Sequence, residues 1–179
     1  MRVVTGTAKG CRLETLEGMD TRPTGERVKE GLFSAISFEI EGRRVLDLFA
    51  GSGQMGIEAL SRGARSCVFV DRNRQAAEVI RRNLQATKLQ VGGQVICRDS
   101  VEYLTHTVQQ FDLVFLDPPY ASELLIPCLQ RLSGKVAAGG TVVCESDRQT
   151  ELPQTVGTLS LYRSYQYGRV IVRLYREEE

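Results

Sequence analysis

From residue 45 onward, the sequence alternates short apolar segments with stretches of helical periodicity. The apolar segments cover residues 45–49, 67–71, 94–97, 111–116 and 141–144, while helical patterns follow residue 56 and cover residues 74–86, 101–107 and 123–132. This alternation is the βαβ pattern of a parallel sheet with helices on its faces. It predicts an α/β domain with five parallel strands.

Both ends of the chain depart from that alternation. Residues 159–165 and 170–175 are rich in β-forming residues and are joined around Gly168 without a helix, which predicts a hairpin with one antiparallel strand. Residues 1–13 favour a small hairpin that turns near Lys9 and Gly10, and residues 25–38 favour a helix. We therefore expect a mostly parallel seven-stranded sheet in a domain over residues 45–179, with residues 1–44 as an N-terminal extension packed on it.

Composition narrows the class of protein. The 179 residues are 42% hydrophobic and 25% charged, which fits one folded domain. No apolar run approaches the roughly 20 residues that cross a bilayer, and the N-terminus lacks the apolar stretch of a signal peptide, so a cytoplasmic location is expected. The five cysteines are odd in number and form no CxxC pair, so we expect reduced thiols and no metal site.

The charge of the chain does not identify the type of partner that it binds. A net charge of +1 neither indicates nor excludes a nucleic acid. Near the N-terminus, basic residues that include Lys29 are interleaved with acidic ones. This pattern is typical of a solvated mixed-charge surface, and a phosphate-binding face is the alternative.

A glycine-rich stretch, residues 47–56 (DLFAGSGQMG), connects a predicted strand to a predicted helix. Gly51, Gly53 and Gly56 allow a sharp turn that lies close to a ligand, as in nucleotide-binding folds. The spacing also matches the dinucleotide fingerprint, and Asp71 follows at the distance expected of a residue that binds a ribose. A nicotinamide enzyme is therefore one candidate, and for Asp71 an ordinary turn at a strand end is the alternative.

Two further acidic residues favour S-adenosylmethionine over a dinucleotide. Asp47 stands inside the strand before the glycines, where a carboxylate can orient the turn and meet the cationic methionine end but would repel a pyrophosphate. Asp99 follows the third strand at the same edge and can accept the adenine amino group, although capping of the next helix is its alternative role. The candidate cofactor-binding residues are Asp47, Phe49, Gly51, Ser52, Gly53, Asp71, Arg72, Asp99 and Ser100.

The fourth apolar segment leads into Asp117, Pro118, Pro119 and Tyr120, at the same edge as the glycine turn. The carboxylate of Asp117 and the carbonyl of Pro118 can accept the N–H groups of an exocyclic amine on a nucleobase. The prolines restrict the backbone and fix these acceptors, and Tyr120 offers an aromatic face for a base drawn out of its stack. An isolated Asp-Pro-Pro can simply end a strand, but the preceding glycine turn favours these four residues as the catalytic set.

These motifs resemble those of the RsmD-type bacterial methyltransferases. The resemblance spans nearly the whole chain and rests on MRVVTG at residues 1–6 with Lys9-Gly10, TRPT at 21–24, RVKE at 27–30, LDLFAGSG at 46–53, EALSRGA at 58–64, DPPY at 117–120 and Tyr167-Gly168. The glycine and DPPY motifs are shared with other amino-methyltransferases, whereas TRPT and the SRGA run are more particular to this family. Arg169 departs from the pattern, since an acidic residue is commoner there.

The resemblance implies a Rossmann-like, class I fold and methyl transfer from S-adenosylmethionine, with S-adenosylhomocysteine as product. The acceptor it implies is N2 of a guanine in 16S rRNA of the small ribosomal subunit, usually guanine 966. Arg22, Thr24 and Arg27 become candidates for substrate binding, although a proline turn whose threonine caps the next helix is as good an interpretation of the first two. We expect a monomer.

Other amino-methyltransferases remain alternatives. A DNA adenine-N6 or cytosine-N4 methyltransferase can use the same tetrapeptide, and a protein-glutamine methyltransferase usually carries Asn where this chain has Asp117. No segment is left over for a DNA target-recognition domain, which favours a folded RNA. An inactive nucleotide-binding module is the alternative from a different class.

Overall fold

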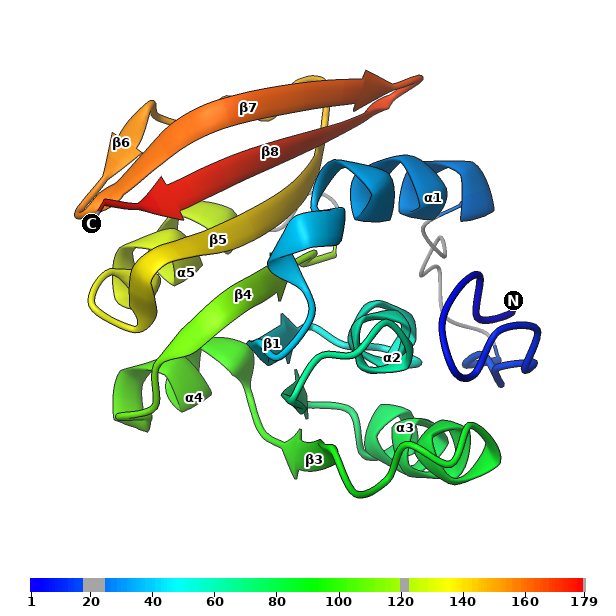
Figure 1. Ribbon diagram of the computed structural model, residues 1–179. Coiled ribbons are helices and arrows are strands. Elements are labelled where there is room, and N and C mark those ends of the chain that lie inside the picture. The colour runs from blue at the N-terminus through cyan, green and yellow to red at the C-terminus, as the bar shows by residue number, and fades with distance from the viewer. Residues whose placement is uncertain (18–24, 120–122, 179) are drawn as a thin grey trace.

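The computed structural model describes residues 1–17, 25–119 and 123–178 (Figure 1). Its helices are α1 (Glu26–Ala35), a short 3-10 helix η1 (Ser37–Glu39), α2 (Gln54–Ser61), α3 (Arg74–Ala86), α4 (Ser100–His106) and α5 (Leu125–Leu132). Its strands are β1 (Arg44–Leu48), β2 (Ser66–Asp71), β3 (Gly93–Cys97), β4 (Phe111–Leu116), β5 (Val136–Asp147), β6 (Thr155–Val156), β7 (Leu159–Tyr167) and β8 (Val170–Glu177).

The strands form one sheet in the order β3-β2-β1-β4-β5-β8-β7-β6. Strands β1 to β5 are parallel, β8 is antiparallel to β5, and β7 and β6 continue the sheet with antiparallel pairing. Helices α1, α2 and α3 cover one face and α4 and α5 the other, so a hydrophobic cluster lies on each side of the sheet (Figure 1). This arrangement confirms the predicted α/β, Rossmann-like fold.

Two details differ from the prediction. The sheet has eight strands because Thr155 and Val156 turn through Gly157, at φ +59°, and pair with β7; two residues are too few to give a sequence pattern. The helix predicted for residues 25–38 stops at Ala35, because Ile36 leaves helical geometry (ψ 15°) with its side chain fully buried, and η1 follows.

The N-terminal segment is fastened to α2 through a buried carboxylate. Glu58, which is 0% exposed, accepts hydrogen bonds from the backbone N–H groups of Val4 (2.9 Å) and Thr5 (3.0 Å). Its carboxylate also forms ion pairs with Lys29 of α1 (3.5 Å) and Arg62 (2.9 Å). Lys29 is 1% exposed, so neither alternative suggested for it by the sequence, a solvated surface or a phosphate-binding face, is right.

Candidate active site at the carboxyl edge of the sheet

The switch in strand order lies between β1 and β4, since the chain leaves β1 toward β2 and β3 and returns to β4 on the other side. Ligands of open α/β sheets bind at the carboxyl ends of the strands beside such a switch. The register aligns Leu48 with Leu116 and Leu116 with Cys144. The ends of β1 and β4 are therefore level with Cys144, and β5 continues three residues further, to Asp147. The predicted site residues that follow β1 and β4 share one edge.

The glycine turn after β1 is held to β2 by Asp71. The Gly51 N–H donates to Asp71 Oδ2 (2.9 Å), and the Asn73 N–H donates to the other oxygen (2.8 Å). Gly51 and Gly53 have φ of +57° and +78°, a region that L side chains rarely adopt, and Gly53 is the N-cap residue of α2. A Cβ placed on Gly51 would meet no atom within 4 Å, so this surface of the turn is open to a ligand.

Asp47 links β1 to the start of α2. Its Oδ2 accepts the Gly56 N–H at 2.9 Å. A side chain at position 56 would clash with β2, because a Cβ on Gly56 would lie 2.3 Å from Cε1 of Phe69. Glycine at this position therefore lets α2 pack directly on β2. Asp47 is only 3% exposed, and burial is the main reason why its pKa rises to about 8, with the charge of Asp71 as a lesser cause.

Phe49 and Ser100 meet at the same edge. Phe49 has φ +57°, an uncommon conformation for a bulky residue, and its N–H donates to Ser100 Oγ at 3.4 Å. Asp99 caps α4 through Oδ1, which accepts from the N–H groups of Val101 (2.9 Å) and Glu102 (3.0 Å). The capping role proposed as the alternative for Asp99 is therefore present, and a contact with adenine stays a prediction.

Asn83 of α3 supports the turn from behind. Its Nδ2 donates to the carbonyl of Ser52 (2.9 Å) and to that of Glu14 (3.0 Å), and its Oδ1 accepts the Glu14 N–H. One buried amide thus ties the cofactor-side turn to the N-terminal segment. Arg72 follows β2 with an exposed side chain, and its carbonyl accepts a bond from Cys97 Sγ.

Asp117 lies directly after β4, with Pro118 buried beside it and Pro119 exposed. Burial is the main reason why the pKa of Asp117 rises well above its usual range, and the carboxylates of Glu145 and Asp47 raise it further. Three acidic side chains, Asp47, Asp117 and Glu145, are therefore close enough to interact at this edge. Glu145 lies near the end of β5, is 7% exposed and was not singled out from the sequence.

Of the remaining candidates, one lies within the described residues and three lie outside them. Arg27 is an exposed residue in the first turn of α1. Tyr120, Arg22 and Thr24 lie outside the described residues, so their predicted roles stay predictions.

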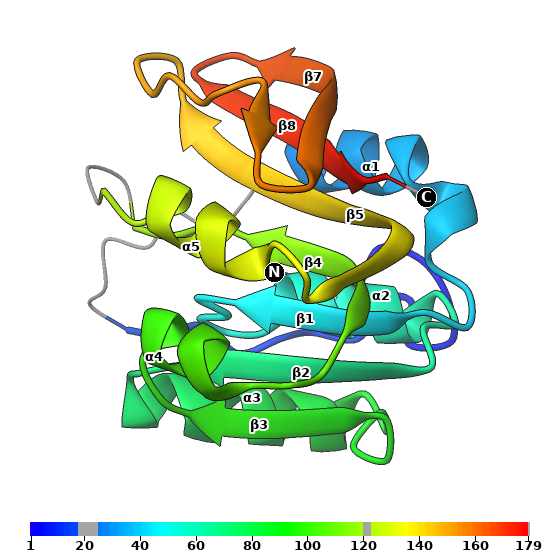
Figure 2. The same cartoon turned by 90° about the vertical axis from the view of Figure 1, so that its left-hand side faces the viewer.

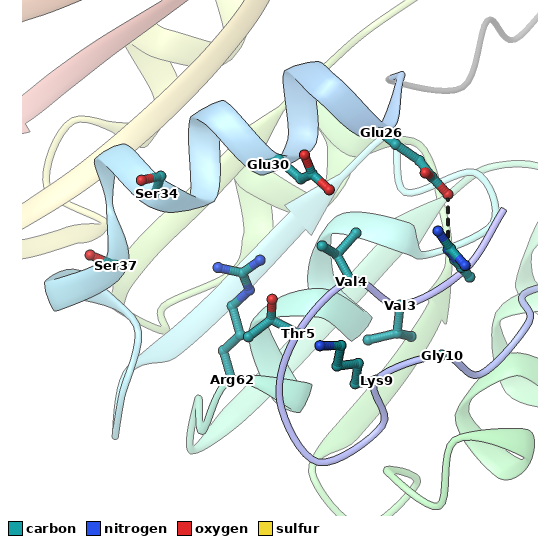
Figure 3. A pocket seen from close by; sticks show the side chains of 11 residues that line it. Val3, Val4, Thr5, Lys9, Gly10, Glu26, Glu30, Ser34, Ser37 and Arg62 are labelled. Atoms are coloured by element: carbon teal, nitrogen blue, oxygen red, sulfur yellow. Dashed lines mark ion pairs between the residues drawn. The ribbon is translucent and has the colours of Figure 1, made fainter.

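Two cavities of about 620 and 610 Å³ lie elsewhere, the first between α1 and the N-terminal segment and the second between that segment and the residues around Ser37 and Arg62. Figure 3 shows the first, with Lys9 and Arg62 facing a space that Glu26 and Glu30 of α1 also line. Neither cavity is lined by a residue of the glycine turn or by Asp117. The mixed charge of the first cavity gives no preference for an anion or a cation, and the second is lined by one charged residue, Arg62.

Within the described ranges, no helix is long and apolar enough to cross a membrane. The same residues contain no group of three or more His, Cys, Asp or Glu side chains arranged to hold a metal ion.

Comparison with known proteins relates the chain to a described family and to solved structures. The family model "Conserved hypothetical protein 95" matches residues 1–176. The "Putative rRNA methyltransferase YlbH" of Bacillus subtilis is 41% identical, with 99% of both chains covered. "Ribosomal RNA small subunit methyltransferase D" of Escherichia coli K12 is 32% identical over 99% of this chain and 90% of that protein. The structure of the "Putative methyltransferase yhhF from Escherichia coli" has a TM-score of 0.89 at 31% identity and covers 99% of this chain and 98% of that one.

Proposed function

We propose that this chain, which belongs to the RsmD family of ribosomal RNA methyltransferases, transfers a methyl group from S-adenosylmethionine to the exocyclic N2 amine of a guanine in 16S rRNA. The family gives the reaction class, methylation of ribosomal RNA. The guanine, its N2 atom and the role of each residue are our proposal. Residues 45–179 would form the methyltransferase domain with residues 1–44 as its extension, acting in the cytoplasm where ribosomes assemble.

One observation carries the proposal: Asp117 and the open glycine turn meet at the switch point of the sheet. Asp47 is among the charges that raise the pKa of Asp117, and it also accepts the N–H of Gly56 at the start of α2. One buried carboxyl group, that of Asp47, therefore interacts with both halves of the predicted site. An acceptor for an amine and a turn for a nucleotide at the same sheet edge suit group transfer between them.

The residues at the turn fit S-adenosylmethionine. The open surface at Gly51 can lie against the ligand, and Asp71, already oriented by two backbone N–H groups, has further acceptor capacity for ribose hydroxyls. The buried Oε1 of Gln54 has no hydrogen-bond partner in the described structure, and an ammonium donor would satisfy it. When bound, S-adenosylmethionine supplies an electrophilic methyl group.

The chain's own groups would position the amine and remove its proton. The carboxylate of Asp117 and the carbonyl of Pro118 accept the N–H groups and aim the nitrogen, and the prolines keep these acceptors fixed. Transfer of the methyl group would break its bond to sulfur, with S-adenosylhomocysteine as the leaving group, and would leave the newly bonded nitrogen with a proton to lose. A carboxylate whose pKa is raised is a stronger base, so the surroundings of Asp117 favour its role as the proton acceptor.

The experiment is transfer of a radiolabelled methyl group to small ribosomal subunits and to free 16S rRNA prepared from cells that lack the gene, followed by mass spectrometry of the nucleosides. We expect N2-methylguanosine from the wild type. The Asp117→Ala variant should lose at least about 100-fold in rate, as expected for loss of a preorganised hydrogen-bond group, while S-adenosylhomocysteine binds with little change. Asp112→Ala, at the other end of β4, is the matched control and should remain active.

Other products would point to the alternatives. N6-methyladenine or N4-methylcytosine formed in duplex DNA would replace the RNA proposal with a DNA methyltransferase, and methylated protein glutamine would favour the protein substrate. Binding of NAD without binding of S-adenosylhomocysteine, measured by calorimetry, would remove the methyltransferase mechanism altogether.

A further inference from the structure

Strand β7 carries a row of side chains, which we call the tyrosine row: Arg163, Tyr165 and Tyr167. Their partners in β8 are Leu174, Val172 and Val170 in turn. Paired residues of antiparallel strands point to the same face, and these three belong to, or pack against, the hydrophobic cluster under α1. The tyrosine row therefore lies on the α1 side of the sheet, with both tyrosines partly exposed and Arg163 exposed.

The row reaches the same edge as the candidate active site. Strand β8 begins at Val170 opposite Asp147, the last residue of β5, so the β7–β8 turn lies at the carboxyl edge. Figure 2 shows this turn on the side of the molecule to which β1 and β4 point. Val172 of β8 pairs with Tyr165 on one side and with Glu145 of β5 on the other, so these three residues are level across the sheet. The distance from β4 to β7 is three strand spacings, or about 14 Å.

Neighbouring residues hold the row in place. A Cβ on Gly31 of α1 would lie 2.6 Å from the Tyr167 hydroxyl and 2.8 Å from its ring carbon Cε1, so the ring lies directly against the helix backbone. The Arg163 guanidinium donates to the Tyr165 hydroxyl (3.2 Å) and lies 6.0 Å from the ring centre of Tyr162. The aromatic surfaces are thus ordered before any partner binds, which lowers the entropic cost of binding.

We propose that the tyrosine row binds unpaired nucleotides of the RNA substrate that flank the methylated base. This proposal rests on the proposed function for the RNA class and adds a second contact, outside the position of the target base. Tyrosine rings accept stacked bases of any sequence, and a guanidinium ordered beside them can stack or bind phosphate. At about 14 Å from β4, the row is too far to hold the target itself but close enough for nearby nucleotides.

Charge around the turn suits a polyanion. Arg163 on β7 and Arg169 in the turn are both exposed, and Arg27 is exposed in the first turn of α1. Each contact between a basic side chain and a phosphate of a single strand contributes about −0.7 to the slope of log affinity against log salt concentration. Replacement of Arg163 and Arg169 by Ala should therefore make that slope shallower by about 1.4.

The experiment measures fluorescence anisotropy of a labelled single-stranded oligoribonucleotide of about 12 nucleotides, within the usual site size of such surfaces. Tyr165→Leu and Tyr167→Leu keep apolar volume against α1 but remove the aromatic face, and each should weaken binding by about 5- to 150-fold. The Phe variants at both positions should bind like the wild type. Arg65→Ala with Arg81→Ala, two exposed cations on other elements, is the charge-matched control.

A duplex RNA of the same sequence separates stacking from general attraction. Its bases are paired, so the leucine variants should bind it like the wild type; an equal loss on duplex and single strand would overturn the stacking proposal, and so would unchanged single-strand affinity. In methyl transfer, the leucine variants should raise KM for RNA with kcat and S-adenosylhomocysteine affinity unchanged. If the wild-type protein binds the oligonucleotide through the tyrosine row but methylates no ribosomal RNA, the proposed function is refuted while binding of RNA by the tyrosine row is still supported.

Discussion

Replacement of Asp47 by Asn should change how the free energy of unfolding depends on pH. In the native protein, burial raises the pKa of Asp47 from 3.8 to about 8, whereas the unfolded chain titrates near 4. Between these values the native state binds one proton more than the unfolded state, so stability falls as pH rises, by up to about 1.4 kcal/mol per pH unit. The stabilisation by the protonated carboxyl is complete below pH 4 and is lost as the pH rises through 8.

Urea unfolding at several pH values between about 5 and 8 measures this slope. The free energy of unfolding of the wild type should fall more steeply with pH than that of the Asp47→Asn variant, whose amide oxygen can still accept the Gly56 N–H. Asp112→Asn is the control: a hydrogen bond from Arg44 lowers the pKa of Asp112, so its contribution is lost only as the pH falls below its ordinary range. Parallel curves for the wild type and Asp47→Asn would refute the buried, protonated carboxyl.

The same variant tests the electrostatics of the proposed cofactor site. S-adenosylmethionine carries a sulfonium cation that S-adenosylhomocysteine lacks, and a nearby cation favours the ionised form of a buried carboxyl. Calorimetry should therefore show that Asp47→Asn loses more affinity for the donor than for the product. Wild-type affinity for the donor should rise as the pH increases toward 8 and then level off.

Three further substitutions test a buried ion pair, the packing of α2 on β2, and the backbone conformation after α3. Lys29→Met leaves Glu58 without one of its two cationic partners and should lower the free energy of unfolding by about 3 kcal/mol, measured by urea unfolding. Gly56→Ala forces a Cβ into Phe69, and we expect a loss of about 1–3 kcal/mol with weaker binding of S-adenosylhomocysteine; unchanged stability would show that α2 can move away. Lys88 follows α3 in the left-handed region (φ +59°), where a side chain is strained and glycine is not. Lys88→Gly should therefore raise the free energy of unfolding by about 0.5–1 kcal/mol, which thermal unfolding would detect as a higher midpoint temperature.

Much of the fold follows from the sequence because its strands are continuous apolar runs bounded by turn residues. The predicted segment 111–116 is the whole of β4, from Phe111 to Leu116. Strand β6 could not be predicted in the same way, because its two residues pair only after Gly157 has turned the chain. The end of α1 depends on burial of Ile36, which is a property of the packed protein and not of the local pattern.

The sequence predicts individual residues of the site but not the interactions between residues that are far apart in the chain. The glycine turn and Asp117 are predicted at one edge because each follows an apolar strand, and Asp47 is predicted there because it lies near the end of the first strand. Glu145 was missed because the predicted fifth strand ends at Cys144, three residues before β5 ends at Asp147. The pairing of Lys29 with Glu58 brings together residues far apart in the sequence, and no local pattern distinguishes a lysine that is buried from one that is solvated.

Asp47, Asp117 and Glu145 lie at one sheet edge, where ionisation of the first two costs the isolated protein stability. Burial raises the pKa of the first two, which means that the folded state disfavours their ionised forms. Functional sites often carry such a cost in stability, and a ligand that binds the native state can restore it. A cation bound beside these carboxyls would do so. The buried carboxyls therefore favour the proposed, positively charged methyl donor over a dinucleotide with its pyrophosphate more strongly than the glycine turn alone does.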